Sequence, residues 1–199
     1  MVEKELVQKV KVPEEISVEV IGKNGLILKS GKGTAEKVFK SHRLKISHAG
    51  NEIILEGSPA NKQTRALLHS VVAHIKNMVE GLIYGYKYEL KIVYSHFPLT
   101  AEVDGNNIKV KNFTGEKFNR RAKIVGDTKV TIKGQEVIIT GIDKESVGQT
   151  VANLELSTKV RKKDIRRFQD GIYLIKAGNI EEKKGKLIEA GKEKEEELA

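Results

Sequence analysis

The sequence predicts an α/β (α+β) protein built from two tandem copies of one small domain, each an antiparallel β assembly packed on a single helix. First, blocks of residues recur in the same order: GNEIILEG at 50–57 returns as GQEVIITG at 134–141, and QTRALL at 63–68 returns as QTVANL at 149–154. Second, each copy passes from alternating apolar and polar residues into one apolar stripe at helical spacing. Collinear repeats of this kind indicate a duplicated domain.

The strands expected early in each copy are half-buried. Ile16, Val18 and Val20 alternate with other residue types in the first copy, and Ile108 and Val110 alternate with lysines in the second. A period of two is typical of antiparallel strands that turn one face to the core and one to solvent. We therefore expect each copy to contribute a sheet that is covered on one side.

One helix is expected in each copy, near 62–80 in the first and near 145–157 in the second. The first helix is marked by apolar residues at three- and four-residue steps, namely Leu67, Leu68, Val71, Val72, Ile75, Met78 and Val79. This stripe is expected to face the core, and Gly81 is expected to end the helix. The second stripe is shorter and rests mainly on Val147, Val151 and Leu154.

Three regions are expected along the chain: an N-terminal repeat over 1–95, a C-terminal repeat over 96–178 and a charged tail over 179–199. Residues 181–199 hold seven acids and five lysines, with too few large apolar residues to form a core of their own. The chain as a whole nevertheless has a net charge of +9. A basic balance favours an acidic polymer as partner.

The densest positive charge lies between the second helix and the last expected strand. Residues 159–167 read KVRKKDIRR, with six basic residues and one acid in nine positions. We expect this basic segment to be held at both ends, because Ile172, Leu174 and Ile175 resemble core residues and Asp170-Gly171 resembles a turn. Positive charge in a fixed position suits the binding of a phosphate backbone. The alternative is that the segment is a solvated surface loop without a binding role. The RNA-binding candidates here are Lys159, Arg161, Lys162, Lys163, Arg166, Arg167, Phe168 and Gln169.

A second basic group precedes this segment in the C-terminal repeat. It adds the RNA-binding candidates Lys117, Arg120, Arg121 and Lys123. The two groups form one broad patch if they share a face. Phe118 and Phe168 could stack on exposed bases or anchor their loops, and anchoring is favoured because aromatic residues make up only 5% of the chain and are needed for packing. The carboxylates of Asp164 and Asp170 are expected to order the loop rather than to act in acid–base chemistry.

The residues give little support to other chemistry. The chain has no cysteine, which excludes disulfides and cysteine-ligated zinc. His69 and His74 are five apart on the expected helix, which is the wrong spacing for a metal pair, and 25–34 has the wrong spacing for a phosphate-binding loop. The N-terminus lacks the apolar core of a secretory signal peptide, and no apolar run reaches membrane-spanning length. We expect a cytoplasmic protein with no metal, cofactor, membrane or small-molecule substrate.

The end of the second copy carries a distinctive order of residues. It contains Gly148-Gln149-Thr150, Asn153-Leu154-Glu155, Lys163-Asp164-Ile165-Arg166 and Phe168-Gln169-Asp170-Gly171-Ile172-Tyr173. This order resembles the closing segment of the ribosomal protein L-six family of the large subunit, in its archaeal and eukaryotic form. Val151 departs from the family, in which a second alanine is expected, and this bears on helix packing. The repeat extends the likeness over residues 6–180.

The resemblance implies a structural component of the large ribosomal subunit and not an enzyme. It implies that large-subunit ribosomal RNA is bound mainly by the C-terminal repeat, near the sarcin–ricin loop and the factor-binding region at the stalk base. Neighbouring ribosomal proteins are further implied partners. From the residues alone, two other classes stay open: an enzyme acting on a small anion between the repeats, and a protein-interaction module that uses the first copy and the tail.

Overall fold

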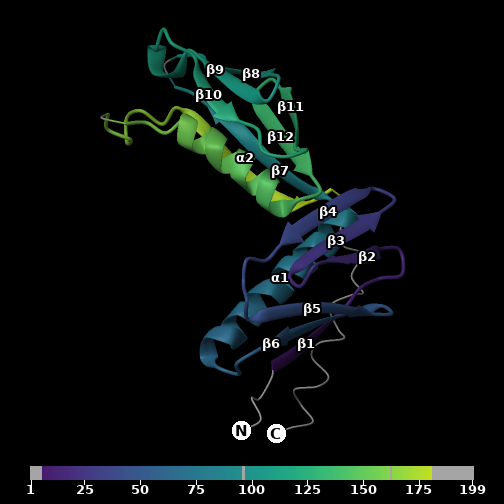
Figure 1. Cartoon of the computed structure of the whole chain (residues 1–199). Coiled ribbons are helices and arrows are strands. Elements are labelled where there is room, and N and C mark those ends of the chain that lie inside the picture. Colours follow the sequence, from purple (N-terminus) through teal and green to yellow (C-terminus); the bar gives the residue numbers. More distant parts are fainter. Residues whose placement is uncertain (1–5, 96, 162, 181–199) are drawn as a thin grey trace, which may run out of the picture.

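The computed structural model describes residues 6–95, 97–161 and 163–180, which form two halves that follow one another along the chain (Figure 1). The expected tail falls almost wholly outside the described residues. The first half contains β1 (Leu6–Lys11), β2 (Ser17–Ile21), β3 (Gly25–Ser30), β4 (Gly33–Val38), β5 (Leu44–Ala49), β6 (Glu52–Gly57) and α1 (Lys62–Tyr84). The second half contains β7 (Tyr86–Val93), β8 (Thr100–Asp104), β9 (Asn107–Lys111), the 3-10 helix η1 (Phe113–Gly115), β10 (Arg120–Lys123), β11 (Lys129–Lys133), β12 (Glu136–Gly141), α2 (Lys144–Ser157) and β13 (Gly171–Asn179).

The two halves share one strand topology, which confirms the predicted fold class. The first half has two antiparallel sheets, in the orders β1-β6-β5 and β2-β3-β4. The second half has the orders β11-β12-β7-β13 and β10-β9-β8. Strand β7 pairs with β12 as β1 pairs with β6, and β9 lies between β8 and β10 as β3 lies between β2 and β4. Strand β13 is the one strand of the second half with no counterpart among the described strands of the first.

Strand β7 belongs to the second half although it directly follows α1. It lies between β12 and β13 in their sheet, and its residues Tyr86, Leu90 and Ile92 are buried in the second core. The boundary expected at residue 95 instead places this strand with the first half. Strand pairing and core membership support a boundary at Gly85, where α1 ends.

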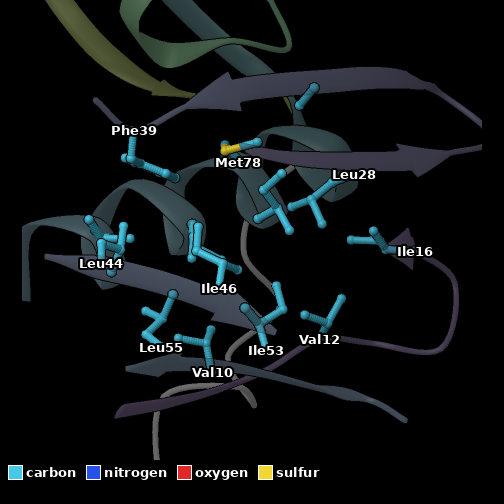
Figure 2. Packing of buried hydrophobic residues seen from close by; sticks show 14 of the residues in the cluster. Val10, Val12, Ile16, Leu28, Phe39, Leu44, Ile46, Ile53, Leu55 and Met78 are labelled. Atoms are coloured by element: carbon cyan, nitrogen blue, oxygen red, sulfur yellow. The ribbon is translucent and has the colours of Figure 1, made fainter. Parts of the chain in front are cut away.

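Helix α1 packs against both sheets of the first half. Its buried face includes Leu68, Val71, Ile75 and Leu82. The strands and the connections between them supply the rest of this core, of which Figure 2 labels Val10, Val12, Ile16, Leu28, Phe39, Leu44, Ile46, Ile53 and Leu55 around Met78 of the helix. The apolar stripe seen in the sequence is therefore core.

Helix α1 begins and ends at residues with specific capping geometry. The Asn61 side chain accepts a hydrogen bond from the Thr64 N–H at 2.8 Å, which satisfies a free amide of the first turn. The expectation that Gly81 ends the helix is wrong: the helix continues to Tyr84 and stops at Gly85, whose φ is +65°. Gly81 has a different role, because a Cβ there would lie 2.0 Å from the Ile142 carbonyl oxygen.

Ile142 joins the two halves just before α2 begins. Its side chain packs against the core of the first half. A Cβ at Gly33 would lie 2.4 Å from Ile142 Cδ1, so two glycines leave room for this one residue. Glu145 of α2 forms an ion pair with Lys37 of β4, and its carboxylate lies 2.9 Å from His74 Nδ1 of α1. These contacts fix the orientation of α2 relative to the first half.

Candidate nucleic-acid interface

The basic segment, residues 159–167, starts where α2 ends and is tied down on both sides. Thr158 caps the helix and is buried, and its hydroxyl oxygen accepts a hydrogen bond from the Ile172 N–H at 3.1 Å. The Glu155 carboxylate accepts one from the Leu174 N–H at 2.9 Å. The segment thus bridges two positions that are held together. Its closing strand differs from expectation, since Ile172 is buried but Leu174 and Ile175 are exposed.

Two carboxylates order the backbone of this region. Asp164 accepts a hydrogen bond from the Arg166 N–H at 2.9 Å through Oδ1, and its carbonyl oxygen accepts one from the Phe168 N–H at 2.9 Å. Asp170 is buried, and its Oδ1 accepts from the Ser95 N–H at 2.7 Å. Both carboxylates are thus engaged in shaping the loop that carries the cations.

The cations of the described segment point outward. The exposed candidates are Lys159, Arg161, Lys163, Arg166, Arg167 and Gln169. Lys163 Nζ lies 4.8 Å from the centre of the Phe168 ring, which is half-buried. A cation above an aromatic face is held by the ring's negative potential. Lys162, another candidate, lies outside the described residues.

The two basic groups of the sequence meet on one face of the second half. Arg121 of β10 and Arg161 of the basic segment line one open hollow, together with Leu156 and Ser157 at the end of α2. The Asn153 side chain of α2 donates to the Lys123 carbonyl oxygen at 2.9 Å, which fixes β10 against this helix. In Figure 1 the loop with η1 and the loop after α2 project from the same end of this half.

Arg120 differs from the other candidates because its guanidinium is engaged within the protein. It donates to both carboxylate oxygens of Glu116, at 2.8 Å and 2.6 Å, and to the Ser157 carbonyl oxygen at 2.8 Å. It also lies 4.1 Å from the centre of the Phe113 ring. The hydrogen bond from Arg120 holds the pKa of Glu116 below its usual range. Arg120 therefore joins β10 to the end of α2 and positions the surface.

Phe118 lies on the surface, so the expectation that it anchors its loop is wrong. Its side chain is 86% exposed, whereas Phe113, five residues earlier, is buried in the core. Phe113 and Phe118 occur in one short polar stretch without periodicity, so the sequence alone does not show which ring is inside. Phe118 is the functional candidate that the sequence reasoning set aside.

We use the term basic face for the outward cations of these two loops and of β10, namely Lys117, Arg121, Lys123, Lys159, Arg161, Lys163, Arg166 and Arg167. Arginine and lysine in fixed positions can contact phosphate and ribose while the fold sets their register. Within the described residues no group of three or more histidines and acids is placed to hold a metal ion. The fold and this face define an α+β protein of two similar halves, whose charged surface suits a phosphate backbone.

Comparison with known proteins gives the family. The family model for ribosomal protein L6 matches residues 97–171. A Staphylothermus marinus protein named large ribosomal subunit protein uL6 is 47% identical over 180 residues, which cover 87% of this chain and 96% of the relative. Proteins of the same name from Methanobrevibacter smithii (43% identical; 84% and 94% covered) and Sulfurisphaera tokodaii (43% identical; 86% and 92% covered) are also similar. The chain belongs to the ribosomal protein L6 family.

Family membership decides between the classes that the residues left open. The chain is a ribosomal protein of the large subunit, a structural component acting in translation and not an enzyme. No helix in the described ranges is long and apolar enough to cross a membrane.

Proposed function

We propose that this ribosomal protein binds large-subunit ribosomal RNA through the basic face of its second half, near the sarcin–ricin loop and the factor-binding region at the stalk base. Neighbouring ribosomal proteins are its other proposed partners, with the first half as the surface for them. The single observation that carries the proposal is the shared hollow of Arg121 and Arg161, which unites two basic groups far apart in the sequence.

The acids near the basic face are engaged elsewhere, which supports this proposal. Glu116 pairs with Arg120, Asp164 accepts backbone N–H groups and Asp170 is buried against Ser95. The outward cations can therefore act on an external anion. Lysines and arginines that neutralise phosphates release the counterions condensed on the RNA backbone, so binding weakens as salt is added.

The salt dependence of RNA binding tests the proposal. A variant with Lys159, Arg161, Lys163, Arg166 and Arg167 changed to glutamine should lower the slope of log affinity against log salt by up to about 3.5 to 4.5, at roughly 0.7 to 0.9 per phosphate contact. The matched control changes five exposed lysines of the first half to glutamine: Lys11, Lys23, Lys40, Lys62 and Lys76. This control removes the same charge from another surface, and the slope should stay near that of the wild type. An unchanged slope in the first variant, or an equal loss in both, contradicts the proposal.

The location on the RNA has its own test, because the chain has no cysteine. Ile165 is 70% exposed within the basic segment, so Ile165→Cys offers a single attachment site for an iron chelate that cleaves nearby RNA. In reconstituted large subunits, cleavage should fall at the sarcin–ricin loop and the stalk base. The same chelate at Val38→Cys, on an exposed position of β4, should cleave elsewhere. Cleavage from residue 165 only at distant RNA would rule out the proposed location.

A further inference from the structure

Phe118 is the most exposed large hydrophobic side chain in the part of the chain that the structure describes. At 86% exposure, its ring has almost none of the packing that an aromatic residue normally makes in a folded protein. Single exposed apolar residues are common and need no explanation by themselves. The surroundings of Phe118 make its exposure informative.

The loop that carries Phe118 is fixed on its N-terminal side. Asn112 adopts a left-handed conformation, with φ +58°, and its side chain donates to the Pro98 carbonyl oxygen at 3.0 Å. Phe113 follows and is buried with 1% exposure. The Glu116 N–H donates to the Phe113 carbonyl oxygen at 3.0 Å, which closes a turn just before the exposed ring.

The loop is also fixed on its C-terminal side, by Arg120. This residue holds Glu116 through two hydrogen bonds and reaches the end of α2 through the Ser157 carbonyl oxygen. Residues 117–119 therefore project between two clamped positions. A ring presented in this way loses little conformational freedom when it binds a flat partner.

The charges around Phe118 indicate the chemistry of that partner. Lys117 and Asn119 on either side of the ring are exposed, as is Arg121. The hydrogen bond from Arg120 is the main cause of the lowered pKa of Glu116 at the base of this loop, and the charge of Lys163 in the basic segment adds to it. An exposed aromatic ring next to Lys117 and three residues before Arg121 fits a nucleotide, whose base has a flat π face and whose phosphates carry the negative charge.

We propose that Phe118 is a stacking platform for an unpaired base of RNA, while the cations beside it bind the flanking phosphates. This inference rests on the proposed RNA-binding function and adds a contact to one nucleotide. Stacking accepts every base, so the ring selects an unpaired nucleotide without selecting its identity. In a continuous duplex every base is paired and stacked, so no base is free to stack on Phe118.

Substitutions at residue 118 separate stacking from plain apolar contact, with affinity for extracted large-subunit ribosomal RNA as the measurement. Phe118→Ala should weaken binding about 5- to 150-fold, and Phe118→Leu should weaken it similarly because leucine has no π face. Phe118→Tyr and Phe118→Trp should bind within a few fold of the wild type. Phe118→Ala with wild-type affinity overturns the inference, and so does Phe118→Leu with wild-type affinity, which would indicate an apolar contact.

Fluorescence gives a second readout, because the chain has no tryptophan. In Phe118→Trp the new indole is the sole one, and stacking on a base should quench its emission when the RNA binds and shield it from iodide. Val38→Trp, at an exposed apolar position of β4 in the first half, is the matched control, and its emission should change much less. An indole at 118 that stays open to iodide in the bound state contradicts the proposal.

Salt titrations distinguish the failure of this inference from the failure of the proposed function. Phe118 is uncharged, so Phe118→Ala should lower affinity at every salt concentration and leave the slope unchanged. If the basic-segment variant loses slope but Phe118→Ala has no effect, only the stacking inference fails. If neither variant changes binding, the basic face itself is not the RNA-binding surface.

Discussion

The guanidinium of Arg120 faces the Glu116 carboxylate squarely, with Nε 2.8 Å from Oε2 and Nη2 2.6 Å from Oε1. The third nitrogen, Nη1, donates to the Ser157 carbonyl oxygen at 2.8 Å. Two parallel charge-assisted hydrogen bonds fix both the position and the plane of the guanidinium. The neighbouring Arg121 points outward from the same strand, so adjacent arginines have different roles.

Replacing each arginine in turn should separate these roles. Arg120→Gln should lower the free energy of unfolding by about 1 to 2 kcal/mol, because hydrogen bonds to charged groups exceed neutral ones while partial exposure weakens the ion pair. Arg121→Gln should leave stability almost unchanged and lower the salt slope of RNA binding by about 0.7 to 0.9. Urea unfolding followed by circular dichroism and RNA titration at several salt concentrations check the two results. Equal effects of both substitutions on stability would contradict the assignment.

The same pair predicts a specific pH dependence. Arg120 holds the pKa of Glu116 below the ordinary value of 4.5, so the folded pKa lies below the unfolded one. The pair therefore stabilises the protein above pH 4.5, and its contribution is lost as the pH falls through the lower folded value. The stability difference between wild type and Arg120→Gln should shrink below pH 4.5. A difference that grows on acidification would contradict the prediction.

Two helical glycines should respond in opposite directions to alanine. Gly148 of α2 has open space at its Cβ position, so Gly148→Ala should stabilise the protein by about 0.5 to 1 kcal/mol. Alanine would raise the helix propensity at Gly81 of α1 by the same amount, but its Cβ would lie 2.0 Å from the Ile142 carbonyl oxygen. Gly81→Ala should therefore be destabilising. Thermal unfolding of both variants checks this, and stabilisation by Gly81→Ala would mean that the close approach to Ile142 is relieved at no cost.

The boundary between the folding units is tested with two fragments. A fragment of residues 86–180 contains β7, the strand between β12 and β13, and should unfold cooperatively. A fragment of residues 96–180 lacks β7 and the buried residues Tyr86, Leu90 and Ile92, so β13 loses its strand neighbour and the core loses part of its filling. It should not unfold cooperatively. Cooperative unfolding of the shorter fragment would favour the boundary at residue 95.

Local patterns and the repeat predicted most of the fold. The collinear blocks marked equivalent strands and helices, and α2 begins one residue before its expected range. The position of β7 in the sheet of the second half was not predicted, because its sequence shows that it is a strand but not which strands it pairs with. The role of Gly81 was not predicted, because the atom that requires a glycine belongs to Ile142, far along the chain.

The candidate site was predicted in composition but not in geometry. Alternation along β10 could have separated the two arginines, since Arg120 shares a face with the buried Ala122, while Arg121 and Lys123 lie on the other. By contrast, no local pattern shows that Phe113 is buried and Phe118 exposed. That difference depends on packing against residues distant in the sequence.

Strand β13 is an edge strand, paired with β7 on one side only. The unpaired N–H and C=O groups of an edge strand can pair with a strand of another molecule, which leads to aggregation. Here the Ile172 and Leu174 amides already donate to Thr158 and Glu155 of α2. The side chains of Glu155 and Thr158 thus occupy two of the positions that an incoming strand would need at the start of β13. The start of this edge strand is thus protected in a newly made copy of the protein before it joins the large subunit, by the same contacts that hold the basic segment in place.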